Sequence, residues 1–389
     1  MCGLVAGIGS SLGLVLGYLA TNLRSDLGVS RGAVGLLASI FFGATGAGSF
    51  SAGTITDRIG PRRAANAQMV LLAAACLIGA AGGSYEILLV ACVIGGFGYA
   101  LGTVGTNLAI VTVVSSERQA RAMTLRTAGV ATVSLPSAFL GPAIAEHVGW
   151  RPILVAVAVV ALASTALVSR VLPADSRHAV VEPTWEVAAP KPGQRPRPVR
   201  LPTGFFWFPI GAFCFVAGVQ AQLSWAVPYL SESLDTTEGN AGALVALSTA
   251  MGIGVMLSLL RHADAPPGQR LTKVAWLSGS CAAWTGLVAL GVSLGPAAVV
   301  VGLAATTAAS LGAVGGMQAA VADAAPYAVG RATGVTFTGY FLGSLVAPTA
   351  FGALVDRQGT YTGAWLVTAA TFALAAVAFT RARRVDGSS

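Results

Sequence analysis

Long stretches without any charged side chain constrain this sequence more than any other feature. Residues 64–83, 87–114, 152–169, 205–231 and 274–322 contain no Asp, Glu, Lys or Arg. Each stretch can cross the roughly 30 Å hydrocarbon layer of a bilayer as a helix that rises about 1.5 Å per residue. Charged residues make up 10% of the 389, against about 25% in soluble domains. The sequence therefore predicts an all-α polytopic membrane protein, with the lipid bilayer as its surroundings.

Apolar runs bounded by charges, Pro or Gly predict twelve transmembrane helices in two sets of six. The first set lies near 1–23, 33–56, 64–82, 86–114, 123–145 and 152–171, and the second near 205–230, 240–260, 271–293, 296–320, 332–354 and 360–380. Two six-helix pseudo-symmetric halves follow, 1–171 and 204–389, the second ending in a short cytoplasmic tail. Residues 172–203 are rich in Pro and charge, which predicts an extended cytoplasmic linker.

The basic residues gather in alternate loops. Counting basic residues near the helix ends, such as Arg126, with the nearest loop, the loops after predicted helices 2, 4, 6, 8 and 10 and the C-terminal tail hold 3, 3, 6, 3, 1 and 3 Lys or Arg, a total of 19. The opposite set holds Arg24, Arg31, Arg151 and Arg357. By the positive-inside rule both termini are cytoplasmic and the protein is a multi-pass protein of the cell membrane. This bias explains the net charge of +8, so nucleic acid is not an expected partner.

Weak internal echoes favour a duplicated half. The tetrapeptides "RAMT" at 121 and "RATG" at 331 are 210 residues apart, and so are Gly149 and Gly359. In the loop after predicted helix 8, only Gly268 and Arg270 match the loop after predicted helix 2.

That loop after predicted helix 2 carries the most specific motif. The segment "GTITDRIGPRR", residues 53–63, resembles the G-x-x-x-D-R-x-G-x-R-R signature of the major facilitator superfamily, which lies between helices 2 and 3. All six fixed positions match: Gly53, Asp57, Arg58, Gly60, Arg62 and Arg63. The resemblance implies a twelve-helix transporter fold over nearly the whole chain.

The motif also implies a conformational gate. An Asp57 carboxylate at the membrane edge needs a donor, and a helix N-terminus supplies free N–H groups and a favourable dipole. By the resemblance, that partner is the start of predicted helix 11, around Arg331 to Gly334. We expect Arg58 and Arg62 to bridge to Glu117. Gly53 permits close approach of another helix, and Gly60 permits a tight reversal.

In this family, helices 1, 4, 7 and 10 line the cavity, with contributions from helices 5 and 11. Polar and aromatic residues at helical spacing in these helices are therefore candidate substrate-binding residues. They are Tyr18, Asn22, Tyr99, Thr103, Asn107, Gln220, Gln222, Trp225, Tyr229, Gln318 and Tyr340. The competing interpretation is that a hydroxyl bonds its own helix carbonyl, whereas a buried amide must find partners.

Arg126 is a further candidate with two interpretations. It lies about one turn inside predicted helix 5, so it could bind an anionic substrate or extend to the cytoplasmic headgroups. The sequence favours the second interpretation.

The predicted function is secondary transport of a small organic molecule by alternating access. No Asp, Glu or His falls near the middle of a predicted helix, so coupling to a proton or another ion stays open. A neutral, partly aromatic cavity suits an uncharged, amphipathic or weakly anionic substrate, which slightly favours drug or metabolite efflux. The alternatives are an uptake permease for a nutrient or organic anion, and a non-transporting receptor with the same fold.

An enzyme is not expected. The segment "GSSLG" at 9–13 fits G-x-S-x-G, but it lies inside predicted helix 1 without a strand-turn-helix context. Gly9, Gly13 and Gly17 instead predict a small-residue packing stripe. The three histidines fall in loops, so we expect no metal site and no cofactor. We expect the protein to be a monomer.

Overall fold

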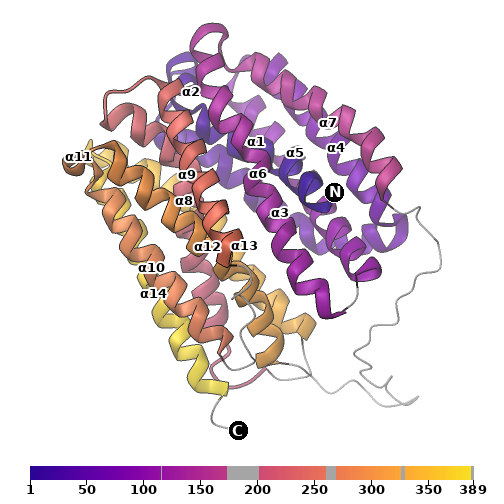
Figure 1. The fold of residues 1–389 in the computed structure, drawn as a ribbon. Coiled ribbons are helices and arrows are strands. Elements are labelled where there is room, and N and C mark those ends of the chain that lie inside the picture. The colour runs from indigo at the N-terminus through magenta and orange to yellow at the C-terminus, as the bar shows by residue number, and fades with distance from the viewer. Residues whose placement is uncertain (115, 173–200, 260–268, 326–328, 387–389) are drawn as a thin grey trace, which may run out of the picture.

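The computed structural model describes the chain except residues 115, 173–200, 260–268, 326–328 and 387–389, and the described part is helical, without strands (Figure 1). The helices up to residue 171 are α1 (Cys2–Tyr18), α2 (Ala20–Leu27), α3 (Arg31–Ile59), α4 (Pro61–Ala81), α5 (Tyr85–Val113), α6 (Ser116–Val148) and α7 (Arg151–Val171). The later helices are α8 (Trp207–Ser233), α9 (Glu238–Leu259), α10 (Arg270–Ala289), α11 (Gly291–Leu294), α12 (Pro296–Ala324), α13 (Val329–Gln358) and α14 (Thr362–Asp386).

The lengths and compositions of these helices suit a bilayer. Ten described helices are long and apolar enough to cross a membrane, and the bent pair α1 and α2 would make an eleventh. The remaining expected segment, 271–293, is occupied by α10, which falls outside that set. Large apolar side chains such as Val159 and Leu374 are more than half exposed, as expected where lipid covers the protein.

Local sequence signals explain where several helices begin and end. Gly28 ends α2 with φ of 64°, which glycine adopts without strain. The Ser30 hydroxyl accepts a hydrogen bond from the Ala33 N–H and so caps the start of α3. Pro61 and Pro296 occupy the first positions of α4 and α12, where a missing N–H costs no helical bond.

The predicted packing stripe on α1 is confirmed. A Cβ at Gly9 would lie 1.6 Å from the Gln68 amide nitrogen, and one at Gly13 would lie 2.6 Å from the Phe41 ring. A Cβ at Gly17 would lie 2.9 Å from the Ser224 backbone. Glycine at these positions lets α1 pack between helices of both sets.

Three helix pairs make most of the contact between the two sets. Helices α1, α3 and α6 from the first set pack against α8, α13 and α9, respectively, from the second. Helices α4 and α7 form one flank of the bundle, and α10 and α14 form the other (Figure 1). We call the end that carries Asp57 to Arg63 the basic end, and the end that carries Arg24 to Gly32 the distal end.

Two expected helix boundaries were wrong. The expected first helix, 1–23, breaks at Leu19, where α1 and α2 meet at a 62° bend. The expected fifth helix begins at Ser116 and not near 123, because the charged segment from 116 to 122 continues the same helix. Both differences affect candidate site residues, because Asn22 follows the bend and Arg126 lies further from the start of its helix than expected. The expected linker lies mostly within 173–200, outside the described residues.

Candidate functional site

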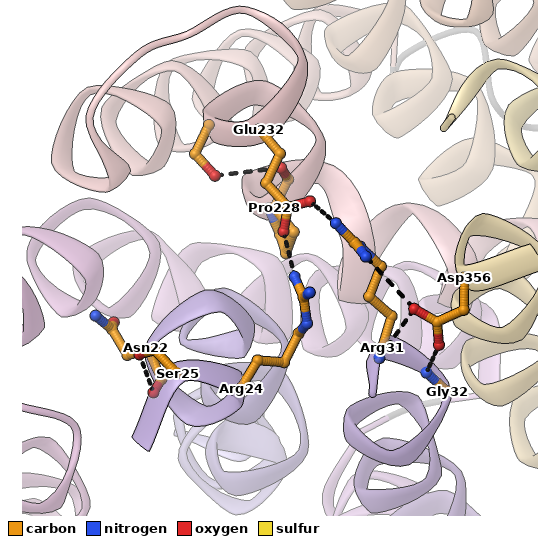
Figure 2. A network of polar contacts seen from close by, with 9 residues as sticks. Asn22, Arg24, Ser25, Arg31, Gly32, Pro228, Glu232 and Asp356 are labelled. Carbon is orange, nitrogen blue, oxygen red and sulfur yellow. Dashed lines mark hydrogen bonds and ion pairs between the residues drawn. The ribbon is translucent and has the colours of Figure 1, made fainter. Parts of the chain in front are cut away.

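A carboxylate from α13 caps the start of α3 at the distal end. Asp356 accepts hydrogen bonds from the backbone N–H groups of Arg31, at 3.3 Å, and Gly32, at 2.9 Å (Figure 2). These N–H groups have no partner within their own helix, and the helix dipole favours a negative charge there. The Arg31 guanidinium also lies 3.4 Å from Asp356 Oδ1. Asp356, near the end of α13 in the second set, therefore binds the first turn of α3 in the first set.

Glu232, near the end of α8, joins the same cluster. It accepts a 2.7 Å hydrogen bond from Arg24 and forms an ion pair with Arg31, as Figure 2 shows. Two guanidinium groups thus meet two carboxylates, and the cluster is neutral. The Glu232 side chain is 19% exposed. Partly hydrated pairs are worth about 1 kcal/mol or less each.

An aromatic residue packs against this cluster of ion pairs. The Arg31 guanidinium carbon lies 5.8 Å from the centre of the Tyr361 ring. Burial, reinforced by the Glu232 carboxylate, raises the pKa of Tyr361, so its phenol stays protonated. The ring therefore adds a neutral, polarisable surface beside the arginine.

A second carboxylate caps a helix at the distal end in the same way. Glu146, near the end of α6, accepts a 2.9 Å hydrogen bond from the Gly239 N–H in the first turn of α9. Glu146 and Asp356 are 210 residues apart, the separation already noted for Gly149 and Gly359. Both glycines have positive φ, 78° and 68°. The two helix sets thus carry matching carboxylate caps, which helical spacing did not predict.

Backbones also approach closely at this end. A Cβ on Gly35 would lie 2.3 Å from the Pro348 carbonyl oxygen, and one on Gly242 would lie 2.2 Å from the Ala138 carbonyl oxygen. Ser39 also accepts a 2.8 Å hydrogen bond from Thr349. The pairs α3–α13 and α6–α9 are therefore closed where the carboxylate caps lie.

The basic end differs. A Cβ placed on Gly53 or on Gly334 would meet nothing within 4 Å, so the close helix approach expected at Gly53 is absent in this conformation. Asp57 is exposed, and among the described residues none donates a hydrogen bond or ion pair to it. Helices α3 and α13 therefore pack tightly at the distal end and separate toward the basic end.

The expected partners of the motif are only partly described. The side chain of Glu117 lies outside the described residues, so its bridge to Arg58 and Arg62 stays a prediction. The contact between Asp57 and the segment from Arg331 to Gly334 also stays a prediction for another conformation. Gly60 has φ of 87° between α3 and α4. The expected tight reversal is therefore confirmed.

The motif has a second copy that the sequence analysis overlooked. The segment "GALVDRQG" at 352–359 repeats the Gly, Asp, Arg and Gly of "GTITDRIG" at 53–60 with identical spacing. One copy ends α3 and the other ends α13, and these antiparallel helices pack together. Each Asp lies at the opposite end of the same helix pair. This signal is readable from the sequence alone.

The candidate residues on α8 are packed in this conformation. Trp225 donates a 3.0 Å hydrogen bond to the Pro348 carbonyl, and Tyr229 donates a 2.7 Å bond to the Val288 carbonyl. Gln222 donates to the Leu303 carbonyl and the Thr307 hydroxyl, at 3.2 and 3.1 Å. Gln220 is buried on the same helix. The hydrogen bonds of Trp225, Tyr229 and Gln222 tie α8 to other helices of the second set.

Two further candidates lie apart from the centre. Asn22 lies beyond the bend in the first span and lines a distal groove of about 390 Å³ with Trp150 and Arg151. The 62° bend between α1 and α2 separates Asn22 from Tyr18. Tyr18 itself is buried. Gln318 is exposed on α12.

The remaining candidates gather around Arg126. Its Nε donates a 2.9 Å hydrogen bond to the Thr106 hydroxyl on α5. The phenol groups of Tyr99 and Tyr340 lie near the Arg126 guanidinium. Thr103 and Asn107 lie one turn apart on α5 and each has a buried oxygen without a hydrogen-bond partner. Among the described residues, this cluster is the best candidate for substrate contact.

Comparisons with known proteins agree with this architecture. The family model described as Major Facilitator Superfamily matches residues 1–348. Among solved structures, a D-xylose-proton symporter has a TM-score of 0.75 at 13% identity, covering 97% of this chain and 95% of that one. A bacterial homolog of the human lysosomal transporter Spinster, in an inward-facing and unoccupied conformation, has a TM-score of 0.69 at 14% identity, covering 99% and 96%. No curated protein matches the chain significantly. The family match spans most of the sequence, and the chain belongs to the major facilitator superfamily.

Proposed function

We propose that this protein is a secondary transporter that moves a small organic molecule by alternating access. The observation that carries the proposal is the difference between the two ends of the α3–α13 pair. At the distal end Asp356 caps the start of α3, while at the basic end Asp57 is exposed. A carrier needs two such closures that form in turn.

The duplicated motif supplies a physical route for the exchange. When the halves rock, the distal contacts of Asp356 and Glu146 break and the basic ends approach. The Asp57 carboxylate then reaches the N–H groups near Gly334, as Asp356 now reaches those of Gly32. One kind of contact replaces another of similar free energy, so neither state is locked.

We propose that the basic end faces the cytoplasm, since 19 of the 23 basic residues were assigned to that side. In that orientation the described conformation is open to the cytoplasm. Efflux of an amphipathic compound is the proposed direction, supported by polar residues without carboxylates around the candidate site. A comparison of transport with and without an ion gradient tests whether a proton or another ion drives the movement.

Counterflow in proteoliposomes tests the proposal. Vesicles that contain the purified protein are preloaded with one compound from a panel of small organic molecules and diluted into its radiolabelled form, with and without a pH gradient. Alternating access predicts transient accumulation of label for at least one compound. A non-transporting receptor predicts binding without accumulation, and that result would overturn the proposed function.

A further inference from the structure

We propose that Arg126 binds the carboxylate of the transported molecule, so that the substrate is an organic monoanion. This inference rests on the proposed transport function and names a substrate class for its pathway. The sequence favoured the other interpretation, in which Arg126 extends to the cytoplasmic headgroups, and the hydrogen bond between Arg126 and Thr106 changes that balance.

Arg126 is held against the neighbouring helix α5. It lies ten residues after Ser116, where α6 begins, and one residue after Leu125, where the apolar span of α6 begins. Its Nε donates to the Thr106 hydroxyl, which in turn donates a 2.8 Å hydrogen bond to the Gly102 carbonyl. The guanidinium is therefore held toward α5 and does not extend along α6 toward the start of that helix at the basic end.

The described surroundings do not neutralise the Arg126 charge. Among the described residues no carboxylate pairs with it, and its Nη2 nitrogen is buried without a hydrogen-bond partner. The titratable groups that influence it are Tyr99, Cys2 and Tyr340. A partly desolvated cation without a counter-ion is costly, whereas an incoming anion would relieve that cost.

The geometry of the free nitrogens suits a carboxylate. With Nε held by Thr106, the Nη1–Nη2 edge of Arg126 is left to meet two oxygen atoms in parallel. One positive charge matches one carboxylate better than a doubly charged phosphate.

Neighbouring groups can complete the site. Thr103 and Asn107 lie on either side of Thr106 along α5, and their oxygen atoms Oγ1 and Oδ1 are buried without partners. The hydroxyl and the amide of these residues can donate to a carboxylate oxygen or bond a polar group beside it. Buried polar atoms of this kind normally have a partner.

Aromatic side chains from both helix sets border the same place. Tyr99 comes from α5 and stacks on Phe41, with ring centres 5.9 Å apart. Tyr340 comes from α13 and packs against Phe337 and Phe341 at 5.5 Å. An apolar substrate body beside the carboxylate would therefore touch both sets, and binding would couple to their relative movement.

Binding of matched probes tests the inference. Isothermal titration calorimetry on the purified full-length protein would compare benzoate, indole-3-acetate and octanoate with benzamide, indole-3-acetamide and octanamide. We expect at least one carboxylate to bind about tenfold or more tightly than its amide, the loss typical of one hydrogen bond to a charged group. R126Q should abolish this preference, and R126K should keep part of it because the charge remains.

Controls separate binding from folding. R170Q removes an exposed arginine at the end of α7 and should leave the preference unchanged. The melting temperature of each variant checks its fold, and a lost preference with retained amide binding cannot arise from misfolding. Equal binding of carboxylates and amides, a preference that survives R126Q, or no carboxylate binding would each overturn the inference.

Counterflow of the same pairs distinguishes this inference from the proposed function. Exchange of the amides without any preference for carboxylates would keep the transporter and overturn the role of Arg126. Carboxylate binding that depends on Arg126, without exchange, would keep the site and overturn transport.

Discussion

Glu146 and Asp356, 210 residues apart, each accept hydrogen bonds from the first turn of a helix in the other six-helix set. Both lie at the distal end, where α6 meets α9 and α13 meets α3. Each contact is modest, about 0.3–1 kcal/mol for an exposed charge at a helix terminus. Together with the Glu232 ion pairs they favour the described conformation by a few kcal/mol at most, so the balance can be reversed by single substitutions.

Asp356→Asn should shift the protein toward a conformation open at the distal end. The amide keeps the shape of the carboxylate but loses its charge, so the cap on Arg31 and Gly32 weakens by about 1 kcal/mol. We expect roughly a fivefold change in the ratio of the two conformations, since 1.4 kcal/mol is tenfold. Spin labels at Ser84 and Ser293, in a background without native cysteines, would measure the distal distance. An unchanged distance distribution would contradict the role of Asp356.

Glu146→Gln should shift the conformations in the same direction as Asp356→Asn, because each carboxylate caps a helix of the other set. If both act on one rigid-body movement, the shifts of the double variant should add in free energy. The same distal spin-label pair would measure all three variants. A shift in the opposite direction for Glu146→Gln would contradict the matching roles.

Gly35→Ala should prevent full closure at the distal end. The new Cβ would lie 2.3 Å from the Pro348 carbonyl oxygen, a clash that the backbone must relieve by moving apart. Gly286→Ala is the matched control, since a Cβ there meets nothing within 4 Å. We expect slowed counterflow and a longer distal distance for the first variant only. Normal closure in Gly35→Ala would show that the approach of α3 and α13 is not required.

Asp57→Asn should slow turnover more than it weakens substrate binding. In the proposed cycle Asp57 makes its contact only when the basic ends close. Its loss therefore destabilises the conformation that is closed at the basic end and leaves the described conformation unaffected. Counterflow rates and binding constants would be compared for the same compound. Asp323→Asn is the control, because Asp323 pairs with Arg270 within one helix set. Equal loss of rate and affinity in Asp57→Asn would contradict the gate.

Much of the fold could be predicted because it depends on strong local signals. Charge-free runs predicted the spans, and Gly60, before a proline and two arginines, predicted the reversal after α3. The break at Leu19 carried no comparable signal, because an apolar run gives no indication of a 62° bend. The start of α6 was misplaced because residues 116–122 are charged, although charged residues form helices readily.

The site could be predicted less well than the fold. Candidate positions were chosen by helical spacing, which places a residue on a face but does not say what covers that face. Trp225 and Tyr229 are on a suitable helix, yet their polar groups bond to backbone carbonyls. The strongest support for Arg126 comes from its hydrogen bond to Thr106 and its buried Nη2 nitrogen, and helical spacing predicts neither. The capping roles of Glu146 and Asp356 depend on contacts between distant segments.

Distances at both ends of the bundle test the central claim most directly. One label pair at Ser84 and Ser293 reports the distal end, and a second pair at Arg170 and Gln269 reports the basic end, each in proteoliposomes. Alternating access predicts two populations in each pair, and Asp356→Asn should lengthen the distal distance while it shortens the basic one. A change at one end without the opposite change at the other would contradict the account.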